Sequence, residues 1–152
     1  MKVNTRVFGE IDILDEKIIR FVNGIVGFPE LTDFALINNS EREGGSAIQW
    51  LQSIQSPEFA IPVMDPLLIL PDYNPQIEDE LVKPIGTLNP DDILVLVTVA
   101  VPKDITQMTV NLKGPIIINA LEKKACQVIA EGENYSVKFP VYDIIQAKKG
   151  DK

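Results

Sequence analysis

The sequence predicts an all-β protein, a small single-domain barrel, closed or nearly closed, of about ten short strands with one or two short helical turns. Three observations support this prediction. Apolar side chains recur at every second residue over short runs that end at Gly, Pro, Asn or Asp, which is the period of a strand. Eleven prolines and nine glycines interrupt the 152 residues and argue against long helices. The run at residues 93–101 is almost wholly apolar, as expected of a strand covered on both faces.

The first part of the chain predicts three short strands. Their alternating residues are Val3, Thr5 and Val7, then Ile11 and Ile13, then Ile19 and Phe21. Asn23-Gly24 is a turn signal after the third run.

Two more strands and a loop are expected next. Phe34 and Leu36 continue the alternation until a polar run, residues 40–46, whose Gly44-Gly45 pair predicts a loop tip. The partner strand is expected over residues 47–52.

The middle of the chain mixes strand and turn signals. Phe59, Ile61 and Val63 alternate again, and residues 67–70 form a short apolar run between two prolines. Two windows favour one or two helical turns each, residues 56–60 and residues 76–82.

Residues 93–101 are the best candidate for the central strand. Runs at 108–112 and 116–118 flank a predicted bend at Gly114-Pro115, and runs at 127–130 and 135–141 complete the set. The tail at about 142–152 is polar and expected to be frayed. We expect these core residues: Ile93, Val95, Val97, Val99, Val110, Ile116 and Ile118.

Composition disfavours several functional classes. The net charge is −8, so a nucleic acid would be repelled and direct DNA or RNA binding is disfavoured. The chain has no histidine, which removes the usual general base and the imidazole metal ligand. Cys126 is the only cysteine, so it can form neither an intramolecular disulfide nor a cysteine-based zinc site. The N-terminus lacks a secretory signal, and we expect a cytoplasmic protein.

Acidic residues gather at residues 72–92, which hold six carboxylates and one lysine. This stretch is either a solubilising face or a docking site for a basic protein. Its carboxylate pairs, Glu78 with Glu80 and Asp91 with Asp92, lie in turn-like segments, which favours a solvated face over a metal or catalytic site. We therefore expect no catalytic residue, no metal site and no bound cofactor.

Four ordered motifs resemble one known family. They are Gly24-Ile25-Val26-Gly27-Phe28, Trp50-Leu51-Gln52-Ser53, Asp72-Tyr73, and the run from Met108 through Gly114-Pro115 to Asn119. Their order and spacing are similar to those of the flagellar assembly factor family FliW. The sequence departs from the family pattern at Val26, where proline is expected, at Val110, where alanine is expected, and at Ala125-Cys126, where a glycine and a basic residue are expected.

The resemblance implies a cytoplasmic bacterial β-barrel protein that binds other proteins and does no chemistry. We expect the protein to be monomeric when free. It implies two protein partners, flagellin and the translational repressor CsrA. A FliW-like protein would bind and antagonise the repressor, and new flagellin would displace it by partner exchange. Two alternatives remain open: a small β-barrel enzyme or ligand carrier with an acidic metal or sugar site, and a flagellin chaperone without a regulatory role.

The shared motifs also suggest where partners bind. The resemblance places five residues on one partner-binding surface: Phe28, Asp72, Tyr73, Asn111 and Asn119. An alternative for Asn111 and Asn119 is that their amides satisfy backbone groups at the Gly114-Pro115 bend.

Overall fold

The computed structural model describes residues 2–6, 8–25, 27–38, 48–87, 89–132 and 135–150. Eleven strands occur in these residues, close to the ten or so expected. They are β1 (Lys2–Thr5), β2 (Gly9–Asp12), β3 (Ile18–Phe21), β4 (Asp33–Asn38), β5 (Ile48–Ser53), β6 (Ala60–Met64), β7 (Ile93–Ala100), β8 (Thr109–Val110), β9 (Ile116–Asn119), β10 (Lys124–Gln127) and β11 (Phe139–Pro140).

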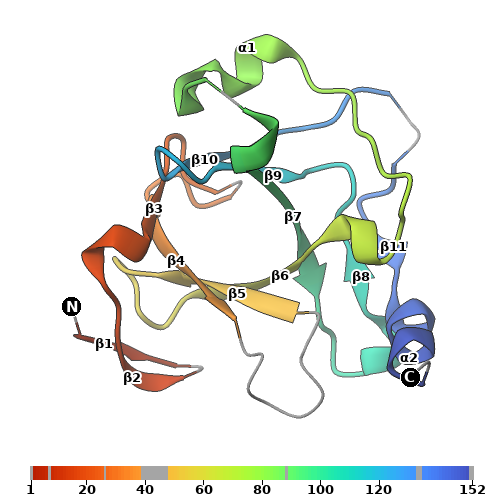
Figure 1. The fold of residues 1–152 in the computed structure, drawn as a ribbon. Coiled ribbons are helices and arrows are strands. Elements are labelled where there is room, and N and C mark those ends of the chain that lie inside the picture. Colours follow the sequence, from red (N-terminus) through yellow and green to blue (C-terminus); the bar gives the residue numbers. More distant parts are fainter. Residues whose placement is uncertain are drawn as a thin grey trace.

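Seven of these strands close into a barrel, which Figure 1 shows end-on. The wall runs β3–β4–β5–β6–β7–β9–β10, and the parallel pairing of β10 with β3 closes it, with Ala125 opposite Phe21. The other neighbours in the wall are antiparallel. The predicted all-β barrel is therefore confirmed.

Strand β7 joins the barrel to its outer layer. Its first half pairs with β9, with Ile93 opposite Asn119, and its last residues pair with β8, with Val99 opposite Val110. The chain changes from β8 to β9 at the predicted Gly114-Pro115 bend. The β1–β2 hairpin lies outside the barrel on one side, and β8 and β11 lie on the other (Figure 1).

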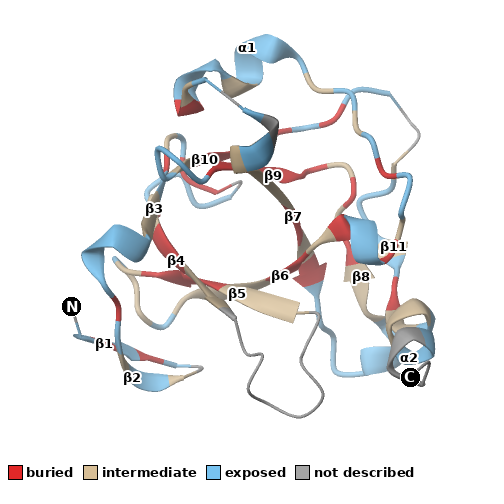
Figure 2. Cartoon of the chain, in the orientation of Figure 1, coloured by how far each residue is buried: buried red, intermediate tan, exposed pale blue. Residues whose placement is uncertain are grey.

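The barrel interior is filled by the inward-pointing side chains, which alternate with outward-pointing ones along each strand. The fully buried side chains include Phe21, Phe34, Leu51, Leu96 and Ile116. Figure 2 shows that buried and half-buried residues follow the barrel wall, whereas the outer turns are exposed. Because a strand points alternate side chains to opposite faces, the same strands also supply an outer apolar face.

That outer face is covered by three smaller clusters. The β1–β2 hairpin covers Ala35 of β4, the segment at residues 77–85 covers Ile117 of β9, and β8, β11 and the C-terminal helix cover Val97 of β7. The barrel wall is thus buried on both sides over much of its area.

The predicted core set divides between these two faces. Ile116 and Ile118 lie inside the barrel, but Val97, Val99 and Val110 are buried in an outer cluster. Ile93 and Val95 are half-buried and also pack on outer clusters, so their assignment to the barrel core was wrong. The inward residues of β7 are Leu94 and Leu96. In a strand that is apolar on both faces, the sequence cannot show which face points inward.

Several local predictions need correction. Residues 56–60 form a turn and the start of β6 instead of a helix. Residues 67 and 68 lie in a 3-10 turn, Pro66–Leu68, and residues 69 and 70 follow it. The side chain of Asp65 caps this turn by accepting a hydrogen bond from the N–H of Leu67. The window at 76–82 contains α1 (Asp79–Val82), so this prediction is confirmed in shortened form. The predicted Gly44-Gly45 loop tip lies outside the described residues.

The expected strand at 127–130 is displaced toward the N-terminus. Strand β10 ends at Gln127, although Val128 N and Ala130 N still donate hydrogen bonds to Pro115 O (3.0 Å) and Lys113 O (2.8 Å). Pro115 has no N–H to return a hydrogen bond, so the ladder does not continue.

The C-terminal segment forms a helix where a polar, frayed tail was expected. Helix α2 (Tyr142–Gly150) begins after Val141, which is fully buried. Ile144 and Ile145 pack on the outer cluster that includes Val97. A helix this short is marginal by itself, so burial of its apolar face stabilises it.

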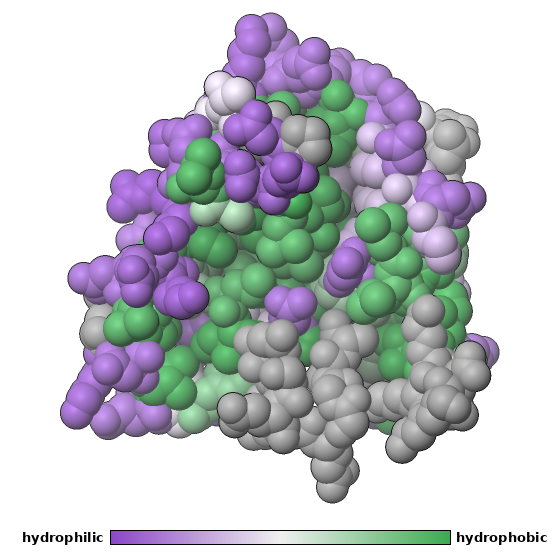
Figure 3. Space-filling model, viewed as in Figure 1, coloured by the Kyte–Doolittle hydropathy of each residue, from purple (hydrophilic) through white to green (hydrophobic). Residues whose placement is uncertain are grey.

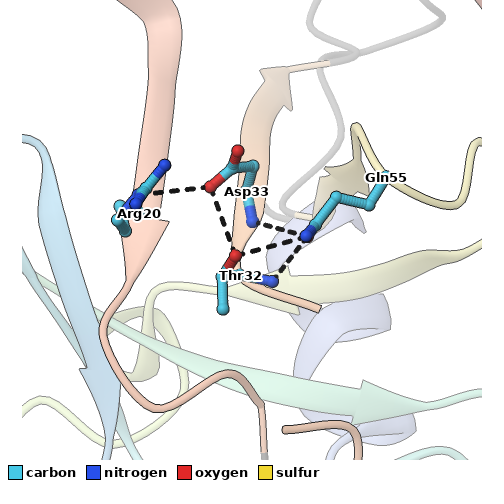
Figure 4. Close-up of polar contacts among 4 residues, drawn as sticks. All are labelled: Arg20, Thr32, Asp33 and Gln55. Atoms are coloured by element: carbon cyan, nitrogen blue, oxygen red, sulfur yellow. Dashed lines mark hydrogen bonds and ion pairs between the residues drawn. The ribbon is translucent and has the colours of Figure 1, made fainter. Parts of the chain in front are cut away.

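A polar cluster joins β3, β4 and the turn after β5 (Figure 4). Gln55 Oε1 accepts hydrogen bonds from the backbone N–H groups of Thr32 (2.7 Å) and Asp33 (3.0 Å). Arg20 Nε forms an ion pair with Asp33 Oδ1 at 3.4 Å. These contacts hold neighbouring segments of the chain together, so we assign the cluster a structural role.

Candidate functional site

Tyr73 attaches the acidic stretch to the barrel. Its side chain is only 7% exposed, its hydroxyl donates a hydrogen bond to Leu112 O (2.5 Å), and its ring packs edge-on against Tyr135 at a centroid distance of 4.7 Å. Burial raises the pKa of the Tyr73 hydroxyl above its usual range, and Tyr135 adds to the shift. Tyr73 therefore offers little surface to a partner and instead positions the exposed Asp72 beside it.

A second hydrogen bond holds the same segment. The backbone N–H of Asn74 donates to the hydroxyl of Tyr135 (2.9 Å). Pro71 and Pro75 restrict the backbone on either side. The segment around Tyr73 is therefore fixed at two points before any partner binds.

Asn111 shapes the bend between β8 and β9. Its Oδ1 accepts hydrogen bonds from the backbone N–H groups of Lys113 (3.1 Å) and Gly114 (2.9 Å). A Cβ at position 114 would lie 2.8 Å from Asn111 Nδ2, so a larger residue there would have to displace the Asn111 side chain. The amide thus satisfies backbone groups at the bend, as the structural alternative expected.

Asn119 is buried, with 1% exposure, at the end of β9. Its Nδ2 donates to Ile85 O (2.8 Å) and Thr87 O (3.2 Å), and its Oδ1 accepts from the N–H of Glu122 (3.2 Å). The side chain therefore links the segment after α1 to the β9–β10 turn. It serves backbone groups at this turn, not at the Gly114-Pro115 bend.

Phe28 lies in the connection from β3, which ends at Phe21, to β4, which begins at Asp33, and its backbone is bridged to that of Ile25. Its ring is 41% exposed and rests on Phe59 at a centroid distance of 4.6 Å. Gly24 has φ +68°, and a Cβ there would lie 2.5 Å from Pro29 O, so only glycine allows the turn to close. An exposed aromatic ring on a turn fixed in this way is a suitable anchor for a partner.

The five predicted site residues lie in three places. Asp72, Tyr73 and Asn111 are neighbours, because the Tyr73 hydroxyl bonds to the residue after Asn111. Asn119 pairs with Ile93 of β7, whereas the backbone N–H of Asn111 donates to Thr98 O of the same strand. These two positions on β7 are five residues apart, so the two asparagines lie roughly 17 Å from each other. The exposed ring of Phe28 rests on Phe59, which in turn packs against Phe34 of the barrel interior.

The acidic stretch, residues 72–92, runs over one end of the barrel and includes α1 (Figure 1), and we call it the acidic flap. Asp72, Glu78, Asp79, Glu80 and Asp91 are all exposed. Lys83, the only base in the stretch, pairs with Glu80 at 3.0 Å. Glu78 forms a side-chain hydrogen bond with Glu131 that raises the pKa of the Glu131 carboxyl above its usual value.

A cavity of about 390 Å³ lies between this stretch and β7. Its walls include Leu67, Tyr73 and Ile77 on one side and Leu94 and Ile117 on the other. Residue-level patterns missed this cavity because its walls come from segments far apart in the chain. Figure 3 shows an apolar centre on the barrel face, with hydrophilic residues along its upper and left margins.

The described residues offer little for metal chemistry. Among them, no group of three or more Cys, His, Asp or Glu side chains is placed to hold a metal ion. Cys126 is 2% exposed, and burial raises the pKa of its thiol. None of the helices in the described part of the chain is long and apolar enough to cross a membrane.

Known proteins share both the sequence and the fold. The family model described as FliW protein matches residues 2–141. The flagellar assembly factor FliW of Lachnospira eligens is 43% identical over 150 residues, covering 98% of this chain and 99% of the relative. That of Lachnoclostridium phytofermentans is 42% identical over 153 residues, covering 99% of this chain and 98% of the relative. A crystal structure of the flagellar assembly factor FliW superposes with a TM-score of 0.84 at 27% identity, covering 93% of this chain and 97% of that chain. The chain therefore belongs to the FliW family of flagellar assembly factors.

Proposed function

We propose that this protein binds and antagonises a CsrA-type translational repressor and also binds flagellin, so that flagellin synthesis follows its secretion by partner exchange. Membership of the flagellar assembly factor family is the observation that carries the proposal. The protein acts in the cytoplasm through protein contacts and performs no chemistry.

The charge distribution supports a basic partner. The net charge is −8, and the stretch at residues 72–92 carries a net charge of −5. Most of its carboxylates are exposed. A field of this sign accelerates encounter with an RNA-binding protein and repels RNA itself.

Asp72 and Phe28 are the proposed direct contacts among the predicted site residues. Both are exposed and both lie on segments with a fixed backbone. Tyr73, Asn111 and Asn119 hold those and neighbouring segments by hydrogen bonds within the chain. We propose that these three residues support binding by positioning the surface.

Calorimetric titration with purified CsrA, with and without flagellin, tests the proposal. Saturable binding that lowers the affinity of CsrA for its RNA, and that flagellin reverses, is the expected result. A protein that binds flagellin but leaves the RNA affinity of CsrA unchanged is a chaperone without a regulatory role. Copurification of RNA with the protein alone would contradict the proposal.

A further inference from the structure

We propose that the cavity between residues 65–77 and β7 receives one apolar side chain from an otherwise cationic segment of a partner protein. The proposal rests on the proposed function, because it specifies the chemistry of the basic partner. Four features of the cavity support it: its size, its lining, its charge and its rigidity.

The cavity is large enough for a single anchoring side chain. Its volume is about 390 Å³, at the lower end of the range for pockets that bind small ligands. Pro66, Leu67, Ile77, Val95 and Ile117 contribute apolar walls. A bulky apolar side chain that fills such a pocket at an interface typically carries a large part of the binding energy.

The negative charge around the cavity favours a positively charged partner segment. Three chain segments supply its walls, at residues 65–77, 93–95 and 117. Within and directly beside them in the chain stand the acids Asp65, Asp72, Glu78 and Asp92, without a lysine or arginine. On the segment bridged to Gln76, Glu131 adds a carboxylate and Lys113 Nζ, bonded to Gly132 O, adds a positive charge. A cleft with a predominantly negative surround favours a segment that carries lysine or arginine around its anchor.

The cavity wall is already ordered. Tyr73 is held through Leu112 O, and Asn74 is held through the hydroxyl of Tyr135. Asp65 Oδ1 accepts a hydrogen bond from the N–H of Leu67 (2.9 Å), which fixes the turn that carries Leu67. Binding therefore does not require this segment to become ordered, which lowers its entropic cost.

Two neighbouring leucines provide a matched test. Leu67 and Leu68 lie on the same 3-10 turn and are 51% and 40% exposed, but only Leu67 lines the cavity. Serine at either position should leave the fold intact. The probe is a short lysine-rich peptide with one central phenylalanine, compared with the same peptide carrying serine at its centre and with a version in which glutamate replaces lysine.

The expected result is binding of the lysine–phenylalanine peptide, with NMR shifts at Val95 and Ile117, and about tenfold weaker binding to Leu67→Ser. Leu68→Ser should bind within about twofold of the parent protein. Equal binding of the serine-centred or glutamate peptides, equal effects of the two variants, or shifts away from the cavity would overturn the proposal.

Titration of the same proteins with CsrA separates this inference from the proposed function. If CsrA binds the parent protein and both leucine variants equally, the cavity is not the anchor site although the proposed function holds. If CsrA does not bind but the peptides discriminate as expected, the proposed function fails and the cavity proposal holds.

Discussion

Asn119 and Tyr73 illustrate, at the scale of single residues, how a polar side chain can be essential to a surface without contacting a partner. Each is buried and bonded to backbone carbonyl groups of a distant segment: Asn119 to Ile85 O and Tyr73 to Leu112 O. Loss of either side chain leaves a buried acceptor unsatisfied, which costs more than an average hydrogen bond contributes. Their first effect should therefore be on stability.

We expect Asn119→Ala to lower the free energy of unfolding by about 1 to 3 kcal/mol, because Ile85 O loses its donor in a buried site. Urea denaturation measures the effect. Asn74→Ala is the matched control, since the side chain of Asn74 is exposed, and it should change stability by less than about 0.5 kcal/mol. If the two variants are equally stable, the structural role of the Asn119 amide is wrong.

Tyr73 should make stability fall at alkaline pH. The pKa of the Tyr73 hydroxyl is raised in the folded protein, whereas in the unfolded chain it is about 10. At a pH between these two pKa values, the folded protein keeps the hydroxyl proton and the unfolded chain has lost it. Stability is therefore fully present below about pH 10 and declines above it, with a limiting slope of about 1.4 kcal/mol per pH unit from this group.

Chemical denaturation of the parent protein and Tyr73→Phe between about pH 8 and 11 tests this prediction. The variant should lose less stability over this range than the parent. Cys126→Ala controls for the buried thiol, whose pKa is also raised, and should retain the contribution from Tyr73. Parallel curves for the parent and Tyr73→Phe would show that burial of this hydroxyl does not govern the alkaline response.

At the scale of elements, tertiary contacts decide several boundaries that local patterns leave open. Helix α2 forms where the chain looks polar, because Val141, Ile144 and Ile145 meet an outer apolar cluster. The β3–β4 turn closes only because Gly24 allows the backbone of Pro29 to approach. Each element can be tested by a change confined to it.

Gly24→Ala should destabilise the protein by more than about 1 kcal/mol and displace Phe28, because the new Cβ would overlap the backbone of Pro29. Gly27→Ala is the matched control: Gly27 also has a positive φ, +90°, but a Cβ added there would have no atom within 4 Å. That variant should bear only the cost of a side chain at positive φ, about 1 to 2 kcal/mol, and should be less destabilised than Gly24→Ala. Thermal unfolding distinguishes them, and equal melting temperatures would contradict the close-approach argument.

Ile145→Asp should unfold helix α2 and lower stability by about 2 kcal/mol or more, since it places a charge in an apolar contact. Gln146→Asp makes a similar change at an exposed position of the same helix and should have little effect. Circular dichroism combined with denaturation measures both. A frayed C-terminal segment would instead tolerate both substitutions alike.

At the scale of the whole molecule, the net charge of −8 and the acidic flap at residues 72–92 should govern association rates. We expect the association rate constant with CsrA to fall about tenfold or more between roughly 50 mM and 500 mM salt, while the dissociation rate changes less. Stopped-flow mixing measures both constants. Asp72→Asn should lower the association rate, whereas Glu10→Gln, an exposed change on the separate β1–β2 hairpin, should have a smaller effect. A salt-independent rate would exclude electrostatic steering.

The sequence by itself determined the barrel class and most of its strands, because the period-two pattern and the spacing of Gly and Pro depend only on local geometry. It also indicated the family, since the ordered motifs extend along most of the chain. The turn at Gly24 and the bend at Gly114-Pro115 were likewise readable, because glycine permits backbone conformations that other residues rarely adopt and proline fixes φ.

Only the tertiary structure decided which face of β7 points inward, because both faces are apolar and only the surrounding clusters distinguish Leu96 from Val97. It also separated Phe28 and Asn119 from Tyr73, which motif spacing could not do. The cavity beside Leu67 arises where segments at residues 65–77, 93–95 and 117 meet. Pairing between segments distant in the chain depends on the closed sheet as a whole, so these features follow from packing and not from local sequence patterns.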